Sequence, residues 1–236
     1  MPKPSFRFKQ FIIRQDRCAL KVGTDGVLFG AWVNYAGATR ILDIGTGTGV
    51  LALIAAQRNS AASIDAIEID DASAEQAAEN AAASPWADRV RIHRMDVRRM
   101  QASEPFNLII CNPPYYAGYS NAADVRVGLA KHSEELLFPE LIDAVDRLLS
   151  PTGRFAVIIP LNREEEFNRE AARADLSPVL RCVVKYVAHR PAKRVLIEFG
   201  RNGGALREKE LIIEATGPFD YSYEYRALIS DLMIGF

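Results

Sequence analysis

The sequence predicts an α/β fold in which a mostly parallel sheet carries helices on both faces. Short apolar runs alternate with longer helical segments along the chain, a pattern typical of a parallel sheet with crossover helices. Two of the apolar runs end in polar motifs, one rich in glycine and one built from asparagine and proline. Ligands bind such sheets outside the carboxyl ends of the strands, so we expect a site there.

Each element has an expected range. A short strand near 6–13 precedes a helix near 26–35. Further strands are expected at 40–45, 63–69, 89–95, 106–111 and 153–160, and helices at 49–58, 71–83, 134–149 and 163–175. Two β-rich runs, 178–188 and 194–199, follow one another without a helix, and we expect a hairpin that adds an antiparallel edge. A strand at 210–215 and an amphipathic helix at 221–235 complete the chain.

Size and composition favour one domain, because 236 residues with 49% hydrophobic content are enough for a full core. We divide it into an N-terminal extension over 1–38 that faces the ligands, a core over 39–200 and a C-terminal extension over 201–236. No apolar stretch reaches the roughly 18 residues of a membrane span, and the charged N-terminus lacks a signal core. Three widely spaced cysteines favour reduced thiols. We therefore expect a cytoplasmic monomer without a metal or membrane partner.

A glycine-rich turn follows the expected strand at 40–45. It contains Gly45, Thr46, Gly47 and Gly49 and leads directly into a helix. Glycine permits positive φ and close approach of a ligand to a helix N-terminus. The spacing is G-x-G-x-G, whereas the dinucleotide fingerprint is G-x-G-x-x-G, so an NAD-type turn is the disfavoured alternative. Asp43 precedes the turn, and its carboxylate would repel a pyrophosphate but suits a ligand with a cationic amino group.

Acidic residues close the next two expected strands. Glu68 lies 19 residues beyond Gly49, where a carboxylate can accept hydrogen bonds from both hydroxyls of a ribose. Asp96 follows the strand at 89–95 and can accept a hydrogen bond from an adenine amino group. The structural alternatives are a solvated strand end for Glu68 and a helix N-cap or surface acid for Asp96.

The tetrapeptide Asn112-Pro113-Pro114-Tyr115 directly follows the apolar run at 106–111. Its prolines fix φ and remove two N–H donors, and Asn112 is pushed into an extended conformation. The stiff corner suits a flat substrate with an exocyclic amino group. The Asn112 side-chain oxygen and the Pro113 carbonyl would accept its N–H groups, and Tyr115 would stack on its ring. An ordinary Asn-Pro turn is the structural alternative.

Charge is unevenly distributed although the formal net charge is −1. Residues 1–40 carry seven basic and two acidic side chains, and residues 181–209 carry eight basic and two acidic ones. This asymmetry favours a polyanionic partner on one face, with solvated surface charge as the alternative. Our candidates for phosphate contacts are Arg190, Lys193 and Arg194.

Together these motifs resemble the class I S-adenosylmethionine-dependent methyltransferases in their order and in their position at strand ends. The Asn-Pro-Pro-Tyr branch is similar to enzymes that methylate exocyclic or amide nitrogens. The segments 6–11, 15–32 and 225–232 further resemble the bacterial tRNA(Val) adenine-N6 methyltransferase family, so that the resemblance covers essentially the whole chain.

This resemblance implies the strand order 3-2-1-4-5-7-6 with an antiparallel seventh strand. It also implies S-adenosylmethionine as the cofactor, an adenine N6 amine of tRNA as the methyl acceptor, and Asn112 as a contact of both. The segment 21–25 would fold over the cofactor, with Thr24 and Asp25 as contacts. The alternative is that Thr24 or Asp25 is only the N-cap of the next helix.

Other functions stay open, because Asn-Pro-Pro-Tyr also serves guanine N2 in rRNA, adenine N6 in DNA and protein glutamine. About 40 residues precede the Asp43 strand, which leaves little room for the helical domain of glutamine enzymes or the recognition domain of DNA enzymes. An RNA-binding module with an inactive cofactor site is the non-enzymatic alternative. The intact glycine turn, Asp43 and Asn112 argue against it.

Overall fold

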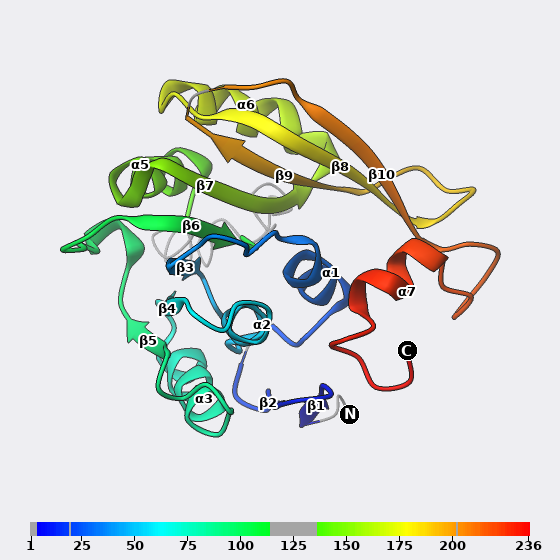
Figure 1. Ribbon diagram of the computed structural model, residues 1–236, viewed down its shortest axis with the longest axis horizontal. Coiled ribbons are helices and arrows are strands. Elements are labelled where there is room, and N and C mark those ends of the chain that lie inside the picture. Colours follow the sequence, from blue (N-terminus) through cyan, green and yellow to red (C-terminus); the bar gives the residue numbers. More distant parts are fainter. Residues whose placement is uncertain (1–3, 19, 114–135, 202) are drawn as a thin grey trace, which may run out of the picture.

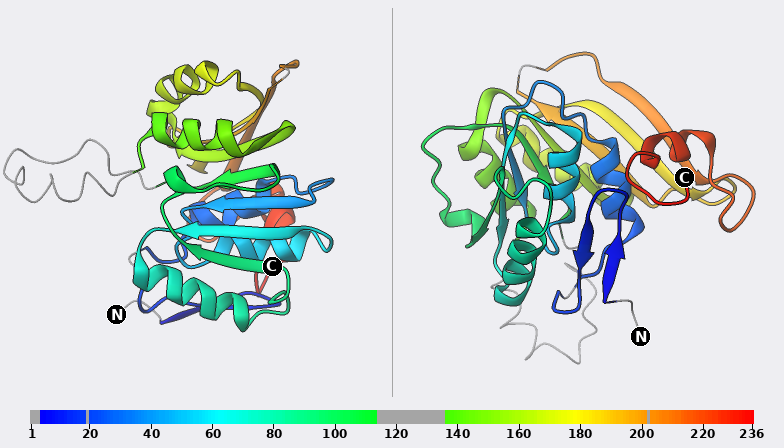
Figure 2. Two further views of the ribbon diagram at one scale, coloured as in Figure 1. Left: turned by 90° about the vertical axis from the view of Figure 1, so that its left-hand side faces the viewer. Right: turned by 60° about the horizontal axis from the view of Figure 1, so that its bottom comes forward.

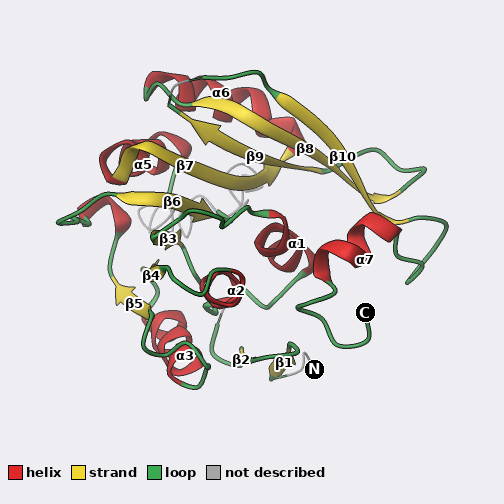
Figure 3. Cartoon of the chain, in the orientation of Figure 1, coloured by secondary structure: helices red, strands yellow, loops and turns green. Residues whose placement is uncertain are grey.

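The computed structural model describes residues 4–18, 20–113, 136–201 and 203–236 (Figure 1). Its strands are β1 (Ser5–Arg7), β2 (Ile12–Arg14), β3 (Arg40–Ile44), β4 (Ser63–Glu68), β5 (Val90–Arg94), β6 (Phe106–Cys111), β7 (Leu149–Pro160), β8 (Ser177–Val187), β9 (Arg194–Gly200) and β10 (Arg207–Glu214). Its α-helices are α1 (Thr24–Trp32), α2 (Val50–Arg58), α3 (Asp71–Ala82), α5 (Phe138–Leu148), α6 (Glu164–Arg173) and α7 (Tyr223–Ile229). Two short 3-10 helices are η1 (Val97–Arg99) and η2 (Leu161–Arg163) (Figure 3).

The central sheet has the order β10-β8-β9-β7-β6-β3-β4-β5 in the described residues. Strands β5, β4, β3, β6 and β7 are parallel, and β9 is antiparallel to both of its neighbours. When the seven strands from β3 to β9 are counted as 1 to 7, their order is the 3-2-1-4-5-7-6 that the resemblance implied, and the seventh strand, β9, is antiparallel. The further strand expected near 210–215 is β10, which pairs in parallel with β8. We expected the β8–β9 hairpin to form the edge of the sheet. Instead β10 pairs with the outer side of β8 and forms that edge.

Helices cover both faces of the sheet (Figure 2). One core lies under α1, α2, α3 and α7, and the other lies under α5, α6 and η1. Successive strand residues point to opposite cores, as Ile41 and Leu42 of β3 do. Because both faces are buried, the central strands read as continuous apolar runs in the sequence.

The N-terminal segment differs from the expectation of one strand near 6–13. It forms a separate antiparallel hairpin of β1 and β2, in which the Phe8 N–H donates to the Phe11 carbonyl at 2.9 Å. The rings of Phe8 and Phe11 stack at 4.3 Å between centroids. The turn contains no glycine, proline or asparagine, so no residue type typical of turns marked a hairpin in the sequence. Helix α1 begins at Thr24 with Gly23 as its N-cap, which excludes the N-cap alternative for Thr24 and Asp25.

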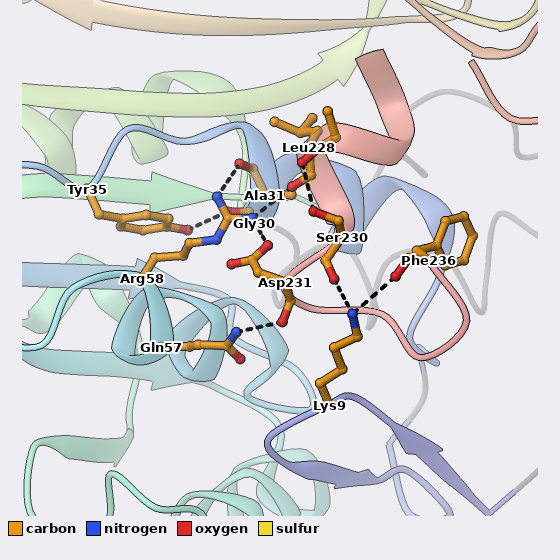
Figure 4. Close-up of polar contacts among 11 residues, drawn as sticks. Lys9, Gly30, Ala31, Tyr35, Gln57, Arg58, Leu228, Ser230, Asp231 and Phe236 are labelled. Atoms are coloured by element: carbon orange, nitrogen blue, oxygen red, sulfur yellow. Dashed lines mark hydrogen bonds and ion pairs between the residues drawn. The ribbon is translucent and has the colours of Figure 1, made fainter. Parts of the chain in front are cut away.

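The two ends of the chain meet beside α1 and α2 (Figure 4). Arg58, the last residue of α2, donates to the Leu228 carbonyl at 2.8 Å and pairs with Asp231 at 2.5 Å. Lys9 in the β1–β2 turn donates to the Ser230 carbonyl at 2.5 Å. These contacts hold the C-terminal segment against the N-terminal half of the fold.

The carboxyl ends of the parallel strands share one edge of the sheet. Strands β3, β4, β5 and β6 end there, and so do β8 and β10, while the antiparallel β9 begins there. This edge therefore brings together the strand-end motifs of the sequence and the turn that joins β8 to β9.

Candidate functional site

A cavity of about 200 Å³ opens at the carboxyl ends of β3, β4, β5 and β6. We call it the first cavity, and its lining includes the glycine turn, Glu68, Asp96, Asn112 and Pro113. The expected site residues come from four different strand ends, and they meet because parallel strands end at the same edge. Apolar side chains such as Ile69, Met95 and Leu136 line the rest of it.

The glycine turn needs the left-handed backbone that glycine allows. Gly45, Gly47 and Gly49 have φ of 70°, 56° and 82°. Gly49 is the N-cap of α2, and a Cβ there would lie 3.5 Å from the Cβ of Ala77. At Gly45 and Gly47, a Cβ would meet no described heavy atom within 4 Å. The turn thus lies in ordinary contact with α3 at Gly49 and is open at Gly45 and Gly47, where a ligand can approach the backbone.

Asp43 lies behind the glycine turn. Its side chain is fully buried, and it is absent from the described residues that line the cavity. The Thr46 hydroxyl donates to Asp43 Oδ2 at 2.5 Å, while Oδ1 has no hydrogen-bond partner among the described atoms. Burial raises the pKa of Asp43 to about 7. Asp43 therefore supports the turn from within, and its contact with a cationic ligand group stays a prediction.

Glu68 at the end of β4 is held by backbone N–H groups. Its Oε2 accepts from Gly47 at 2.8 Å, and its Oε1 accepts from Ile69 at 2.9 Å and from Asp70 at 3.0 Å. A carboxylate offers about four acceptor positions, so these bonds fix its orientation and leave little capacity for further donors. Glu68 joins β4 to the glycine turn and faces the first cavity.

Asp96 is the N-cap of η1, as its structural alternative predicted, and it also lines the first cavity. The guanidinium of Arg98 binds its carboxylate through Nε at 2.7 Å and Nη2 at 2.6 Å. These hydrogen bonds lower the pKa of Asp96 below its usual value. Arg98 also pairs with Glu140 of α5 at 3.0 Å, so the carboxylate is both charged and fixed.

A second cavity of about 270 Å³ adjoins the first on the other side of the glycine turn. Its lining includes Asp25, Asn112, Pro113 and the segment 21–23. Asn112 and Pro113 line both cavities, so the end of β6 lies at their junction. Thr24 is the first residue of α1 and is absent from the described lining of either cavity. Pro114 and Tyr115 lie outside the described residues.

The candidate phosphate contacts lie at the β8–β9 turn, on the same edge of the sheet. Arg190 and Lys193 are exposed. Arg194 pairs instead with the carboxylate of Asp25, with 2.9 Å between Nε and Oδ2. Other basic residues of this region, Arg181, Lys185 and Arg201, also pair with carboxylates. Much of the local positive charge is therefore neutralised within the fold.

The sequence did not identify two buried side-chain amides of α3, those of Gln76 and Asn80. Gln76 accepts from the N–H groups of Arg17 at 3.0 Å and Cys18 at 3.2 Å. Asn80 binds Arg14 and the glycine turn, and both amides are 1% exposed. Their spacing of four residues on one helix face was the available signal. They anchor the segment that leads to the second cavity.

Within the described ranges, no group of three or more His, Cys, Asp or Glu side chains is arranged to hold a metal ion. No helix in the described part of the chain is long and apolar enough to cross a membrane.

Comparison with known proteins decides the family. The methyltransferase small domain family matches residues 27–159. A protein of Trichodesmium erythraeum named tRNA1(Val) (adenine(37)-N6)-methyltransferase is 41% identical over 233 residues, with 97% of each chain covered. A protein of the same name from Flavobacterium psychrophilum is 44% identical, with 94% of this chain and 96% of the relative covered. The chain belongs to the tRNA1(Val) (adenine(37)-N6)-methyltransferase family.

Solved structures support the fold of this methyltransferase. An Agrobacterium tumefaciens protein described as a predicted O-methyltransferase superposes with a TM-score of 0.68 at 19% identity, covering 87% of this chain and 95% of the other. The ribosomal protein L11 methylase of Lactobacillus delbrueckii superposes with a TM-score of 0.57 at 18% identity, covering 81% and 84%. Likeness at such identities shows the class I methyltransferase fold alone.

The first cavity of the methyltransferase fits a nucleoside-bearing cofactor such as S-adenosylmethionine. Open space beside Gly45 and Gly47 allows close approach to the backbone. A fixed carboxylate, Glu68, lines the cavity, and apolar side chains such as Met95 can cover the faces of a flat ring. The donor and acceptor groups of the described lining are thus of the kinds that such a cofactor needs.

Proposed function

We propose that this protein transfers a methyl group from S-adenosylmethionine to the N6 amine of adenine 37 in tRNA1(Val), in the cytoplasm. The observation that carries the proposal is near-complete coverage of curated relatives of that name at 41% to 44% identity. Relatives that match over whole chains share the cofactor-binding core and the flanking segments, which favours a shared substrate as well as a shared reaction.

The cofactor would extend across both cavities, with its nucleoside in the first and its amino acid end in the second, beside the 21–25 segment. Glu68 would accept hydrogen bonds from the ribose hydroxyls, with one of its backbone bonds giving way, and Asp96 would accept from the adenine amino group. The backbone of Gly45 and Gly47 would pass close to the rest of the molecule. When bound, S-adenosylmethionine supplies a methyl group on a positively charged sulfur, which is an excellent leaving group.

Asn112 and Pro113 would orient the substrate amine. Their position at the junction of the two cavities supports this role, because the transferable methyl group of a cofactor that spans both cavities would lie there. The lone pair of an aromatic amine is delocalised into the ring. Two N–H groups held by the Asn112 side-chain oxygen and the Pro113 carbonyl favour a pyramidal nitrogen that aims its lone pair outward. Orientation of this kind can contribute about 7–11 kcal/mol.

The transfer forms an N–C bond as the C–S bond breaks, and the amine then releases one N–H proton to water. A strong general base is not required, because the methylated amine cation is acidic. Tyr115 would stack on the adenine, worth roughly 1–3 kcal/mol, and this role stays a prediction for a residue outside the described ranges.

The tRNA would approach the carboxyl edge of the sheet. A base in an anticodon loop can unstack and swing into a pocket. Exposed Arg190 and Lys193 in the β8–β9 turn lie on this edge, and they remain our candidates for phosphate contacts.

The proposal is tested by methyl transfer from labelled S-adenosylmethionine to bulk tRNA from cells that lack this gene. Digestion to nucleosides should give labelled N6-methyladenosine, and mapping should place it at position 37 of tRNA1(Val). Label in rRNA, DNA or protein, with none in tRNA, would overturn the substrate and keep the methyltransferase. Absence of cofactor binding in a calorimetric titration would instead favour an RNA-binding module with an inactive cofactor site.

A further inference from the structure

Asp25 binds two side chains from the far end of the sheet. It is the second residue of α1, and its carboxylate accepts hydrogen bonds from the hydroxyl of Tyr186 in β8 and from Arg194 Nε at the start of β9. The Arg194 bond is 2.9 Å long, and the Arg194 and Asp25 side chains are only 24% and 21% exposed. This ion pair joins segments that are 169 residues apart in the sequence.

The same carboxylate belongs to the wall of the second cavity. Asp25, Gly26 and the segment 21–23 line it together with the glycine turn. Tyr186 and Arg194 are absent from the described lining of either cavity. In the described arrangement both therefore contact the wall at Asp25.

The wall is tied down at both of its ends. On the N-terminal side, the Val22 N–H donates to Gln15 Oε1 at 2.8 Å, and the Lys21 ammonium donates to the Cys18 carbonyl at 2.7 Å. On the α1 side, the bonds from Tyr186 and Arg194 hold Asp25. Loss of the second attachment would free one end of the wall and leave a negative charge at the cavity without its counter-ion.

We propose that Arg194 and Tyr186 are positioning residues that hold Asp25, and with it the 21–26 wall, in the shape that binds the methyl donor. The inference rests on the proposed function for the identity of the two ligands. It assigns Arg194 to the cofactor side of the site, whereas the sequence suggested a phosphate contact. It leaves Arg190 and Lys193, in the same turn, as the residues that meet the tRNA.

Arg194 is assigned to cofactor binding, and its neighbours Arg190 and Lys193 are assigned to tRNA binding. Variants of these residues should therefore change different binding constants. Arg194→Gln should raise the Kd of S-adenosylmethionine about tenfold and change the KM for tRNA by less than about twofold. Arg190→Gln and Lys193→Gln should do the reverse, raising the KM for tRNA without changing the Kd of the cofactor. Calorimetry on the full chain gives the Kd, and initial rates at saturating cofactor give the KM.

A matched control comes from the opposite edge of the sheet. Arg201 directly follows β9 and pairs with Asp146 at 2.8 Å, with its side chain 20% exposed. Arg201→Gln removes a comparable ion pair far from the cavities, so it should leave the cofactor Kd unchanged. Any loss of thermal stability that the two variants share can then be separated from the loss of cofactor binding.

Conservative variants keep the test meaningful where Arg194→Gln folds poorly. Arg194→Lys keeps the charge and should restore most of the cofactor affinity, and Tyr186→Phe should weaken it about threefold. In a double-mutant cycle, Asp25→Asn should cost less affinity in the Arg194→Gln background than in the wild type, because both changes remove the same pair.

Several results would overturn the positioning role. One is an unchanged cofactor Kd in Arg194→Gln together with a raised KM for tRNA, which would restore the phosphate contact. Another is an equal effect of Arg194→Gln and Arg201→Gln on the cofactor Kd. Wild-type protein that binds S-adenosylmethionine but methylates no tRNA would contradict the proposed function instead, and the cofactor Kd values would still decide the positioning role.

Discussion

Asn80 donates a hydrogen bond from its side-chain amide to the backbone carbonyl of Thr48 at 2.9 Å, and so ties α3 to the glycine turn. The same amide donates to the Arg14 carbonyl at 2.8 Å and accepts from the Arg14 N–H at 2.8 Å. A single buried side chain thus satisfies backbone groups of the turn and of the N-terminal segment. Asn80 therefore supports both the glycine turn, which lines the second cavity, and the N-terminal segment that leads to this cavity.

Replacing Asn80 should loosen both the glycine turn and the N-terminal segment. Asn80→Ala leaves the buried carbonyl of Thr48 and part-buried backbone groups of Arg14 unpaired, so we expect a loss of about 1–3 kcal/mol in the free energy of unfolding and weaker cofactor binding. Urea denaturation and calorimetry measure the two effects. The control is Asn107→Ala, because Asn107 accepts from the N–H groups of Thr39 and Arg40 at the opposite edge of the sheet. Equal changes in cofactor Kd for both variants would count against the specific role of Asn80.

Asn112 is expected to act on the substrate amine more than on the cofactor. Asn112→Ala should lower kcat by about 100-fold or more, since it removes an acceptor for the N–H group. The Kd of S-adenosylmethionine should change by less than about threefold. Asn112→Asp keeps an acceptor oxygen and should retain more activity than the alanine variant. Turnover by Asn112→Ala at the wild-type rate would rule out the amine-orienting role.

Glu68 should matter to the cavity even before a ligand binds. In Glu68→Gln, an amide NH2 replaces one of the two oxygens that accept from the N–H groups of Gly47, Ile69 and Asp70. We expect the cofactor Kd to rise about tenfold or more and the melting temperature to fall. Calorimetry and a thermal melt give both quantities. Wild-type affinity in this variant would show that the ribose is held by other groups.

Asp43 should make stability depend on pH. Burial raises its pKa to about 7 in the folded protein from 3.8. The folded state therefore holds a proton that the unfolded state releases, so this contribution is full at low pH and is lost as pH rises through about 7. Relative to Asp43→Asn, which cannot ionise, wild-type stability should fall by up to about 1.4 kcal/mol per pH unit. Urea denaturation between about pH 5 and pH 8 measures the difference, and a constant difference would contradict the raised pKa.

Arg58 should stabilise the C-terminal segment. Arg58→Ala removes donors to the Leu228 carbonyl and the partner of Asp231, and we expect a loss of about 1–3 kcal/mol in the free energy of unfolding. Carboxypeptidase digestion should release the C-terminal residues faster than in the wild type. Because these contacts lie away from both cavities, the cofactor Kd should stay within about twofold of wild type. Unchanged digestion would show that Lys9 and the packing of α7 suffice.

Most of the architecture could be predicted because it depends on local patterns. Central strands buried on both faces appear as continuous apolar runs, and the expected ranges of these strands agree with the observed ones to within a few residues. The helix expected at 221–235 is shorter than expected, because α7 ends at Ile229. The eighth strand β10 was expected as a segment, but its place beside β8 was not. The β1–β2 hairpin was missed because its turn contains none of the residues that usually mark one.

The first cavity could also be anticipated, since Glu68, Asp96 and Asn112 follow strands whose carboxyl ends must share an edge. The environment of each of these side chains could not be anticipated from the sequence. Full burial of Asp43 depends on the packing of α2 over the glycine turn, and the pairing of Arg98 with both Asp96 and Glu140 depends on where α5 lies.

By itself, the sequence determined the glycine turn and the edge at which the ligands bind, because periodicity, glycine spacing and proline restrict the backbone locally. The strand order followed from the family resemblance that these motifs carry. Only the tertiary structure decided which charges meet. The sequence suggested a phosphate contact for Arg194, and the fold shows its ion pair with Asp25; likewise, only the fold shows that the Asn80 amide binds the Thr48 carbonyl. Hydrogen bonds act over about 3 Å, so side chains far apart in the sequence become partners only when the packing of the sheet and helices brings them together.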